Sequence, residues 1–418
     1  MPWIERKAEA ELLRMMRASR AVVVNGPRQA GKSALLRRIA DSYGAGAYIS
    51  LDDRVELRAA RLDPVGYLAE RPTPLFLDEF QRGGDPLVLA LKSRLDRQGR
   101  RGQVVLAGST RFLAEPRISE SLAGRVRFLD LWPLSQGEIH GGDDGLLRAL
   151  LSGVAAVRRR RPAPLKRSEV AARIATGGLP EAVLLDRERD RRDLFDAYVR
   201  TIVQRDIPTL AAIRQGDELE VLWRLVAART GGELVPASVA RAAGVPDATA
   251  RRYLTLLETV FAFHVLGPFA ANLSVRMSGR PKVHVVDVGV ATHLLRETAA
   301  RLGSVTNPAF GPLLETFVAN ELARQRSWSD EIVDLHHLRV HGGTEVDIVA
   351  VGTGGAVAGI EVKATASPTP EDTRGLRWLA DAVGDRFVQG VIVCLVEAPV
   401  ALARNITAVP VAAVWASA

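Results

Sequence analysis

One segment, AVVVNGPRQAGKSALLRRIA at residues 21–40, constrains the fold of this chain more than any other. A short apolar run typical of a strand leads into a glycine-containing turn, and a helix with Leu35, Leu36 and Ile39 on one face follows. The turn matches the full pattern G-x-x-x-x-G-K-[ST] of a phosphate-binding loop, whose backbone N–H groups and helix N-terminus attract phosphate. The residues expected to contact nucleotide phosphates are Gly26, Pro27, Arg28, Gln29, Ala30, Gly31, Lys32 and Ser33.

Within this loop, Lys32 is expected to reach the β- and γ-phosphates of ATP, and Ser33 to bind Mg2+. The segment PTPLFLDEFQR supplies the second half of such a site, with a buried strand that ends in two acids. Asp78 would complete the Mg2+ shell and Glu79 would orient the attacking water. Alone, LDE fits a strand that leads into a solvated turn; the phosphate loop favours the catalytic interpretation.

Two later segments could complete this site. The third apolar strand, in QVVLAGSTRF, ends in Ser109 and Thr110, which are placed to sense the γ-phosphate from a neighbouring strand end. Arg125, in SLAGRVRF, is a candidate arginine finger, acting either within its own chain or across a subunit contact. A solvated surface arginine is the alternative.

The composition limits the number of domains, the kinds of partner and the kinds of site that this chain can have. A chain of 418 residues can bury two or three cores, and its net charge of +8 with a pI near 10.0 favours a polyanionic partner such as nucleic acid. Arginine richness can also reflect the base composition of a genome. Cys394 is the only cysteine, which excludes an internal disulfide and a cysteine-based zinc site. The apolar runs are too short to span a membrane and no export signal is evident, so a cytoplasmic protein is expected.

A series of motifs in fixed order extends over nearly the whole chain: GPRQAGKS, SLDD, LFLDEFQ, LAGST, SLAGRV, WPLSQGE, GGLPEA, EVDIV and IEVKA. In these motifs the sequence resembles prokaryotic AAA-type ATPases that end in a restriction-endonuclease-like domain of unknown function. The resemblance implies an α/β chain with an AAA-type P-loop NTPase domain, a helical connector with a winged helix, and a C-terminal restriction-endonuclease-like α/β domain. The arginine-rich VRRRRPAPLKR, around residues 158–161, departs from this pattern and is expected to be a solvated basic loop.

The expected winged helix has some support in the residues themselves. ASVARAAG, a turn at VPDA and TARRYLTLLETV have helix-turn-helix spacing, and RPKVHVVDVG could add a wing strand. Arg251 and Arg252 lie near the start of the second helix, where such a helix meets DNA. Winged helices also serve as protein–protein spacers, and that alternative stays open.

Near the C-terminus, four residues form the parts of a PD-(D/E)xK nuclease centre. The helix FGPLLETFVANELARQ carries Glu315, and the two strands of EVDIVAVGTGGAVAGIEVK carry Asp347, Glu361 and Lys363. Carboxylates from Glu315, Asp347 and Glu361 would bind Mg2+, and Lys363 lies on the same face of its strand as Glu361. The alternative is a surface salt bridge on two ordinary strands.

We therefore expect four domains: an ATPase domain at 1–140, a helical lid or connector at 141–215, a winged helix at 216–290 and a nuclease-like domain at 291–418. Two functions fit this arrangement. The first is an Mg2+-dependent ATPase that gates a nuclease acting on DNA or RNA, with DNA the expected substrate. The second is a nucleotide-dependent switch or scaffold whose C-terminal domain binds a partner without cleaving it. Self-association is expected if Arg125 acts between subunits. A zinc site at His336, His337 and His341 is disfavoured because no cysteine or H-E-x-x-H helix accompanies them.

Overall fold

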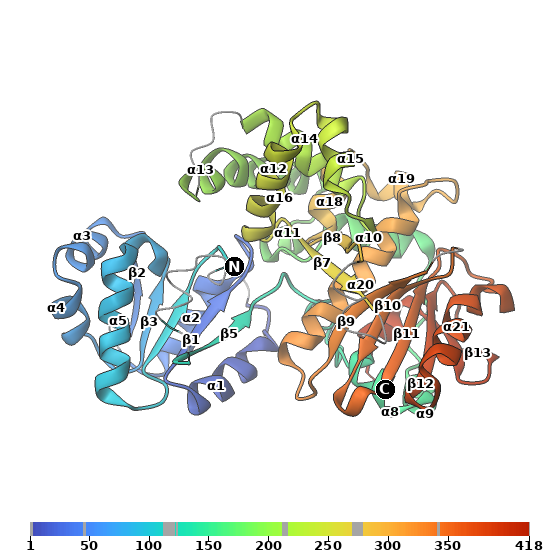
Figure 1. Ribbon diagram of the computed structural model, residues 1–418, viewed down its shortest axis with the longest axis horizontal. Helices are drawn as coiled ribbons and strands as arrows, with labels where there is room; N and C mark the ends of the chain where they lie inside the picture. The colour runs from blue at the N-terminus through green and yellow to red at the C-terminus, as the bar shows by residue number, and fades with distance from the viewer. Residues whose placement is uncertain are drawn as a thin grey trace. The chain divides into compact units, whose positions relative to one another are not determined.

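The chain folds into two compact units (Figure 1), each with its own central sheet. The computed structural model describes residues 3–44, 47–111, 122, 124–210, 216–269, 279–340 and 343–417. Unit 1 comprises residues 1–133 together with 259–261, and unit 2 comprises residues 134–258 and 262–418.

Unit 1 is a five-stranded sheet with helices on both faces. Its strands are β1 (Ala21–Asn25), β2 (Tyr48–Ser50), β3 (Leu75–Asp78), β4 (Val104–Ala107) and β5 (Val126–Asp130). Its helices are α1 (Ala8–Ala18), α2 (Lys32–Asp41), α3 (Arg54–Leu62), α4 (Pro64–Ala69) and α5 (Gly84–Gln98). The strands lie in the order β2-β3-β4-β1-β5 and pair in parallel throughout. All carboxyl ends of the strands therefore meet at one edge of the sheet.

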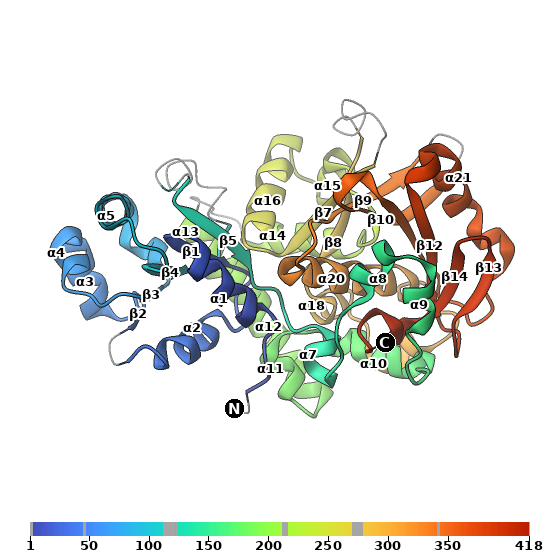
Figure 2. The same cartoon turned by 90° about the horizontal axis from the view of Figure 1, so that it is seen from below.

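Successive side chains of each strand point to opposite faces of this sheet, and helices cover both faces. Val23, Leu75 and Leu77 belong to the core cluster that includes residues of α4 and α5. Helix α2 contacts β2, β3 and β4, and Figure 2 shows it on the opposite side of the sheet from α5. Strands buried on both faces need nearly continuous apolar sequence, which the run AVVV of β1 provides.

Unit 2 begins with helices. These are α7 (Gln136–His140), α8 (Leu146–Ser152), α9 (Val154–Arg159), α10 (Arg167–Thr176), α11 (Pro180–Leu184), α12 (Glu188–Thr201), α13 (Ile207–Leu210), α14 (Gly216–Ala227), α15 (Pro236–Ala243) and α16 (Asp247–Thr259). Later helices are α18 (Val288–Leu294), α19 (Ala299–Gly303), α20 (Phe310–Trp328) and α21 (Arg374–Val383). A π-helical turn at Ile202–Asp206 joins α12 to α13.

A single nine-stranded sheet organises unit 2. Its strands are β6 (Gly232–Glu233), β7 (Phe263–Pro268), β8 (Lys282–Val285), β9 (Asp334–Arg339), β10 (Glu345–Val351), β11 (Val357–Val362), β12 (Phe387–Cys394), β13 (Val400–Ala403) and β14 (Ile406–Pro410). Their order is β13-β14-β12-β11-β10-β9-β7-β8-β6. In the sequence-predicted winged-helix segment, β6 lies between α14 and α15, and β7 and β8 follow α16. These antiparallel strands are joined to the C-terminal strands through the parallel pair β7–β9.

Two helices lie against the C-terminal strands. Helix α21 packs Leu376, Leu379 and Val383 into the core cluster that contains Val346 and Ile392 of the sheet. Helix α20 is buried over most of its surface and contacts β8 and β11. It therefore spans the distance between the two parts of the sheet. Within the described ranges, no helix has the length and apolar character needed to cross a membrane.

Candidate functional sites

The sequence-predicted phosphate loop lies between the end of β1 at Asn25 and the start of α2 at Lys32. Gly31 has a φ of 92° and Gln29 a φ of 60°, the left-handed backbone that lets the chain curl toward a helix N-terminus. A Cβ at Gly26 would lie 2.1 Å from the backbone oxygen of Leu131, so only glycine fits there. These constraints explain the glycines of the motif, and the loop together with the first two residues of α2 contains all eight residues expected to contact phosphate.

Arg6 braces this loop from outside the motif. Its Nη1 donates to the oxygen of Ala30 at 2.6 Å and its Nη2 donates to the oxygen of Trp132 at 2.6 Å. The side chain is buried, and it ties the loop to the segment that follows β5. The sequence contained no signal for this contact because its partners are backbone atoms far along the chain.

Lys32 is folded back onto the loop. Its Nζ donates to the oxygens of Gly26 at 2.8 Å and Pro27 at 2.7 Å, and only 6% of the residue is exposed. Ser33, the next residue, is exposed to solvent. The ammonium is therefore held by neutral carbonyls, which a phosphate can replace, and the hydroxyl is accessible to a metal ion.

The acids of LFLDEF lie at the same edge of the sheet as the phosphate loop. Asp78 ends β3, where its Oδ2 accepts from the Tyr48 hydroxyl at 2.8 Å. Glu79 follows with a φ of 50°, and its Oε2 accepts from Gln81 Nε2 at 2.5 Å. Burial raises the pKa of Glu79 above its ordinary value, and the charge of Lys32 opposes the shift. Glu79 is thus half-buried and electrostatically coupled to the loop lysine.

Ser109 lies two residues beyond the end of β4. Because β4 lies between β1 and β3, this strand end separates the phosphate loop from Asp78. Ser109 is half-buried. Its position is suitable for a contact with nucleotide, and its sensing role remains a prediction.

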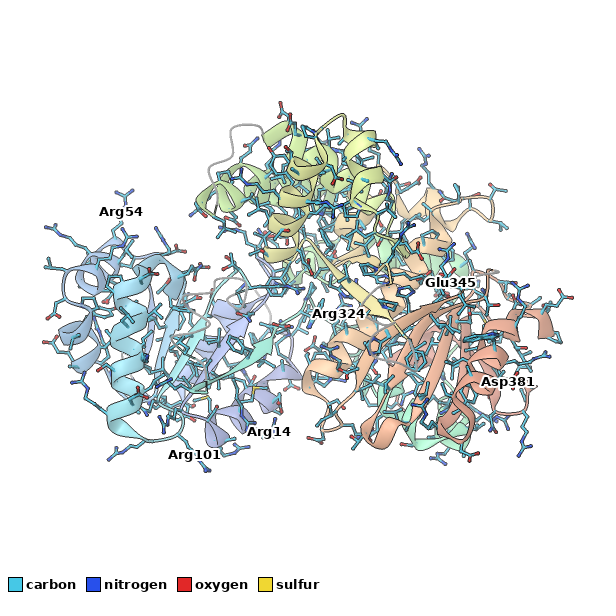
Figure 3. The ribbon with its side chains drawn as sticks, in the orientation of Figure 1. Arg14, Arg54, Arg101, Arg324, Glu345 and Asp381 are labelled. Carbon is cyan, nitrogen blue, oxygen red and sulfur yellow. The ribbon has the colours of Figure 1, made fainter. Side chains whose placement is uncertain are left out.

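Arg125 is not near the phosphate loop of its own chain. It precedes β5, whose first residue pairs with the first residue of β1, so it lies at the amino edge of the sheet. There its guanidinium donates to Asp96 at 2.7 Å and 3.0 Å. In Figure 3, Arg101 precedes β4 and so marks the amino edge of the sheet, and Arg54 follows β2 and so marks the carboxyl edge. Arg125 and Lys32 of one chain thus lie at opposite edges of the sheet, which disfavours a finger acting within the chain, and the arginine-finger role stays a prediction.

Unit 2 contains the second candidate site. Glu315 from α20, Asp347 from β10, and Glu361 and Lys363 from and just after β11 line one cavity of about 1210 Å³. Glu345, two residues before Asp347 on β10, lines the same cavity and is labelled in Figure 3. The fold therefore brings together the four residues that the sequence singled out, and it adds Glu345.

Glu361 and Asp347 are not a solvated surface pair. The Asp347 Oδ2 accepts from the backbone N–H of Val362 at 2.9 Å, and Lys363 Nζ lies 3.0 Å from Glu361 Oε2. The side chain of Glu361 is 5% exposed and that of Lys363 is 36% exposed. Burial, with the nearby charge of Asp347, raises the pKa of both Glu315 and Glu361 to about 8. The surface salt bridge considered for these strands therefore does not describe Glu361.

Lys282, which the sequence analysis did not select, lies among the carboxylates of this cavity. From β8 its Nζ reaches Glu315 Oε1 at 2.8 Å, Glu345 Oε1 at 2.6 Å and Asp347 Oδ1 at 2.9 Å. Its side chain is 1% exposed. The only sequence signal was a lysine within the valine-rich run KVHVV.

The expected metal ligands do not fit a divalent ion as they stand. Among the residues that the structure describes, no three or more His, Cys, Asp or Glu side chains are grouped so as to hold one. Glu315 and Asp347 instead share the ammonium of Lys282. His336 and His337 lie on β9, and His341 lies outside the described residues.

Comparison with protein families assigns the first domain. Residues 18–140 match the family described as AAA domain. These residues form a P-loop ATPase domain of the AAA type. Two further families, both described as domains of unknown function, match residues 167–301 (DUF8612) and 310–414 (DUF4143). The ATPase domain thus contains the phosphate loop and the acids Asp78 and Glu79, and the carboxylate cavity draws its residues from both later segments.

Individual relatives extend over most of the chain. Uncharacterized proteins of Mycobacterium tuberculosis and Mycobacterium bovis are each 29% identical over 368 residues, which is 88% of this chain and 75% of theirs. Among solved structures, a Walker-type ATPase of Pyrococcus abyssi aligns with a TM-score of 0.41 and 14% identity, covering 70% of this chain and 96% of that one. AMPPCP-bound DnaA of Aquifex aeolicus aligns with a TM-score of 0.29 and 15% identity, covering 60% and 85%.

Proposed function

We propose that the chain binds and hydrolyses ATP with Mg2+ at the carboxyl edge of the unit 1 sheet. The observation that carries this proposal is the arrangement of Lys32 and Ser33 at the start of α2 with Asp78 and Glu79 at the end of β3. Both pairs lie at one edge of a parallel sheet, where α/β proteins bind nucleotides. The assignment of residues 18–140 to the AAA domain family supports it.

Each residue has a definite task in this proposal. Lys32 exchanges the carbonyls of Gly26 and Pro27 for the β- and γ-phosphates. Ser33 and Asp78 would hold Mg2+, which would supply positive charge to the phosphoryl group under attack. Glu79 orients the attacking water, and Ser109 contacts the γ-phosphate.

Phosphate release by the purified chain tests this proposal. We expect hydrolysis that requires Mg2+, stops in EDTA and recovers when Mg2+ is restored. Turnover that continues in EDTA would contradict the assignment of Ser33 and Asp78 as metal ligands.

We further propose that the chain couples this ATPase to a nuclease-like domain at residues 291–418 that binds or acts on nucleic acid, with DNA the expected form. The convergence of Glu315, Asp347, Glu361 and Lys363 on one cavity supports the nuclease-like assignment. The net charge of +8 supports a polyanionic partner.

Two specific observations favour different roles for the C-terminal domain. The full set of PD-(D/E)xK residues in one cavity favours cleavage. The Lys282 ammonium among the carboxylates favours binding without cleavage, as part of a nucleotide-dependent switch. Labelled single- and double-stranded DNA and RNA, incubated with Mg2+ or Mn2+ and with or without ATP, distinguish the two. Cleavage lost in Asp347→Ala supports the nuclease, whereas binding without cleavage supports the switch.

A winged helix at residues 216–290, after a helical connector at 141–215, is part of the same proposal. It is supported by α14, α15 and α16 and by the antiparallel strands β6, β7 and β8. Arg251 and Arg252 lie on the second helix of the expected helix-turn-helix. If this helix meets DNA, the double variant Arg251→Ala/Arg252→Ala binds DNA more weakly and with a shallower salt dependence. Unchanged binding would favour the protein–protein spacer.

A further inference from the structure

The ammonium of Lys282 has a complete set of carboxylate partners. A lysine ammonium has three N–H donors, and its three ion pairs reach Glu315, Glu345 and Asp347 at 2.6–2.9 Å. These partners come from α20 and from two positions on β10. One cation therefore ties together a helix and a strand that are otherwise separate elements.

The position of Lys282 is fixed by the sheet. In β8, Lys282 is paired with Glu233 of β6 and with Leu266 of β7. This pairing fixes the backbone of Lys282, and because its side chain is 1% exposed, its ammonium has carboxylates rather than water as partners. A buried charge is costly unless it is paired, so Lys282 and the carboxylates stabilise one another in the buried position.

A divalent cation and this ammonium compete for the same oxygen atoms. Mg2+, Mn2+ and Ca2+ need carboxylate oxygens within about 2.0–2.6 Å, and Glu315 Oε1 and Asp347 Oδ1 already contact Nζ. Placing a second cation there would bring two positive charges within a few ångströms of each other. The two occupants therefore exclude one another.

We infer that Lys282 is the resident cation of this carboxylate cluster, so that the wild-type chain binds no divalent ion between Glu315 and Asp347. The inference rests on the proposed nuclease-like assignment in one respect. That assignment is the reason to expect that the carboxylates would bind a divalent ion if Lys282 were absent. Lys282 thus takes the structural place of a metal, and the C-terminal part of unit 2 keeps its cluster intact in EDTA.

Mn2+ titration followed by electron paramagnetic resonance tests this inference on the nucleotide-free chain. Bound Mn2+ is read from the loss of the free-ion signal. Wild type and Asp347→Asn are expected to bind the same amount, because no ion occupies the cluster in either. Wild type binding one more Mn2+ than Asp347→Asn would overturn the inference, and Glu315→Gln provides the same comparison from the other element.

Removing the ammonium should create the site that it now fills. Lys282→Met is expected to bind one additional Mn2+. Its affinity should be at least tenfold higher than that of any Mn2+ binding in wild type that is lost in Asp347→Asn. The added site should disappear in Lys282→Met/Asp347→Asn. Lys166→Met, which removes an exposed lysine of the same unit, is the matched control and should resemble wild type.

The outcomes are separable from those of the proposed function. A folded Lys282→Met that binds no additional Mn2+ would overturn the inference, with circular dichroism checking the fold. If Lys282→Met does not fold, the comparison of wild type with Asp347→Asn still decides. Nucleotide and nucleic acid are absent from the titration, so failure of ATP hydrolysis or of DNA binding leaves its result unchanged.

Discussion

Two buried lysines, Lys32 and Lys282, differ in the groups that their ammonium contacts, and this difference decides whether a ligand can displace those contacts. Lys32 contacts the neutral backbone oxygens of Gly26 and Pro27, whereas Lys282 contacts three carboxylates. Hydrogen bonds between a cation and a carbonyl are weaker than those between a cation and an anion. A phosphate can therefore compete for Lys32, while Lys282 loses more than it gains by leaving its cluster. The first lysine is suited to ligand exchange and the second to a permanent structural role.

Lys32→Ala is expected to abolish ATP binding. The variant removes the cation that neutralises the β- and γ-phosphates, and the loop backbone remains. Fluorescent-nucleotide titration should show at least a tenfold loss of affinity, with no detectable turnover. Lys92→Ala on α5 of the same unit is the control and should bind normally. Normal hydrolysis by Lys32→Ala would contradict the phosphate-loop assignment.

Glu79→Gln is expected to separate binding from chemistry. The amide keeps the size of the side chain and the backbone turn, but it cannot take a proton from water. General acid–base groups contribute about 10²–10⁴-fold to rate, so turnover should fall by about that factor while ATP affinity is kept. Single-turnover phosphate release measures the rate of hydrolysis, and nucleotide titration measures the affinity for ATP. Full turnover in this variant would transfer the role to Gln81 or Ser109.

His284 should make unit 2 sensitive to acid. Burial, with the charges of His264, Lys282 and His337, holds its pKa well below the ordinary value of 6.5. The unfolded chain therefore takes up a proton below about pH 6.5 that the folded chain does not, and stability falls as the pH drops.

A comparison with His284→Asn isolates this contribution, because all other titrating groups are common to both chains. The unfolding free energy of wild type minus that of the variant should decrease below pH 6.5, by up to about 1.4 kcal/mol per pH unit. Urea unfolding between pH 7.5 and pH 5 measures it. A difference that is independent of pH would mean that folding does not lower the pKa of His284.

At the scale of the elements, helix α21 approaches the carboxylate cluster through Gly375. A Cβ there would lie 2.0 Å from the backbone oxygen of Glu345 and 2.8 Å from Glu361 Oε1. Gly375→Ala is therefore expected to destabilise unit 2 by about 1–3 kcal/mol, the usual cost of overpacking. Gly311→Ala is the control, because nothing lies within 4 Å of its Cβ position on α20 and alanine favours a helix. Denaturant unfolding of both variants makes the comparison, and equal midpoints would contradict the close approach of α21.

Elements with a local pattern could be predicted from the sequence. The strand before the phosphate loop, helix α2, the strand Leu75–Asp78 and the long helix that carries Glu315 are all confirmed. Periodicity and glycine spacing encode such features within a few residues. The strand pair that carries Asp347 and Glu361 is confirmed for the same reason.

Contacts between distant elements could not be predicted in this way. Lys282 meets Asp347 across 65 positions of sequence, and Arg6 meets Trp132 across 126. The order of strands in a sheet decides such meetings, and no pattern within one strand records it. Arg125 shows the same limit: its sequence neighbourhood favoured a finger, but strand direction places it at the edge away from Lys32.

At the scale of the whole molecule, the position of Arg125 leaves action in a neighbouring subunit as the remaining proposal for a finger. In that arrangement each ATP would be contacted by Lys32 of one chain and Arg125 of another. Self-association then becomes a condition for turnover, and the rate per chain should rise with protein concentration.

Mixing two inactive variants tests this directly. Lys32→Ala lacks the phosphate contact but retains Arg125, and Arg125→Ala retains the phosphate loop but lacks the finger. If the finger acts between subunits, each variant alone is inactive and their mixture recovers part of the wild-type rate, because some contacts pair an intact loop with an intact arginine. If Arg125→Ala alone hydrolyses ATP at the wild-type rate, Arg125 has a structural role that includes its contact with Asp96. A mixture with no recovery, from variants that each associate normally, would likewise remove Arg125 from the catalytic site.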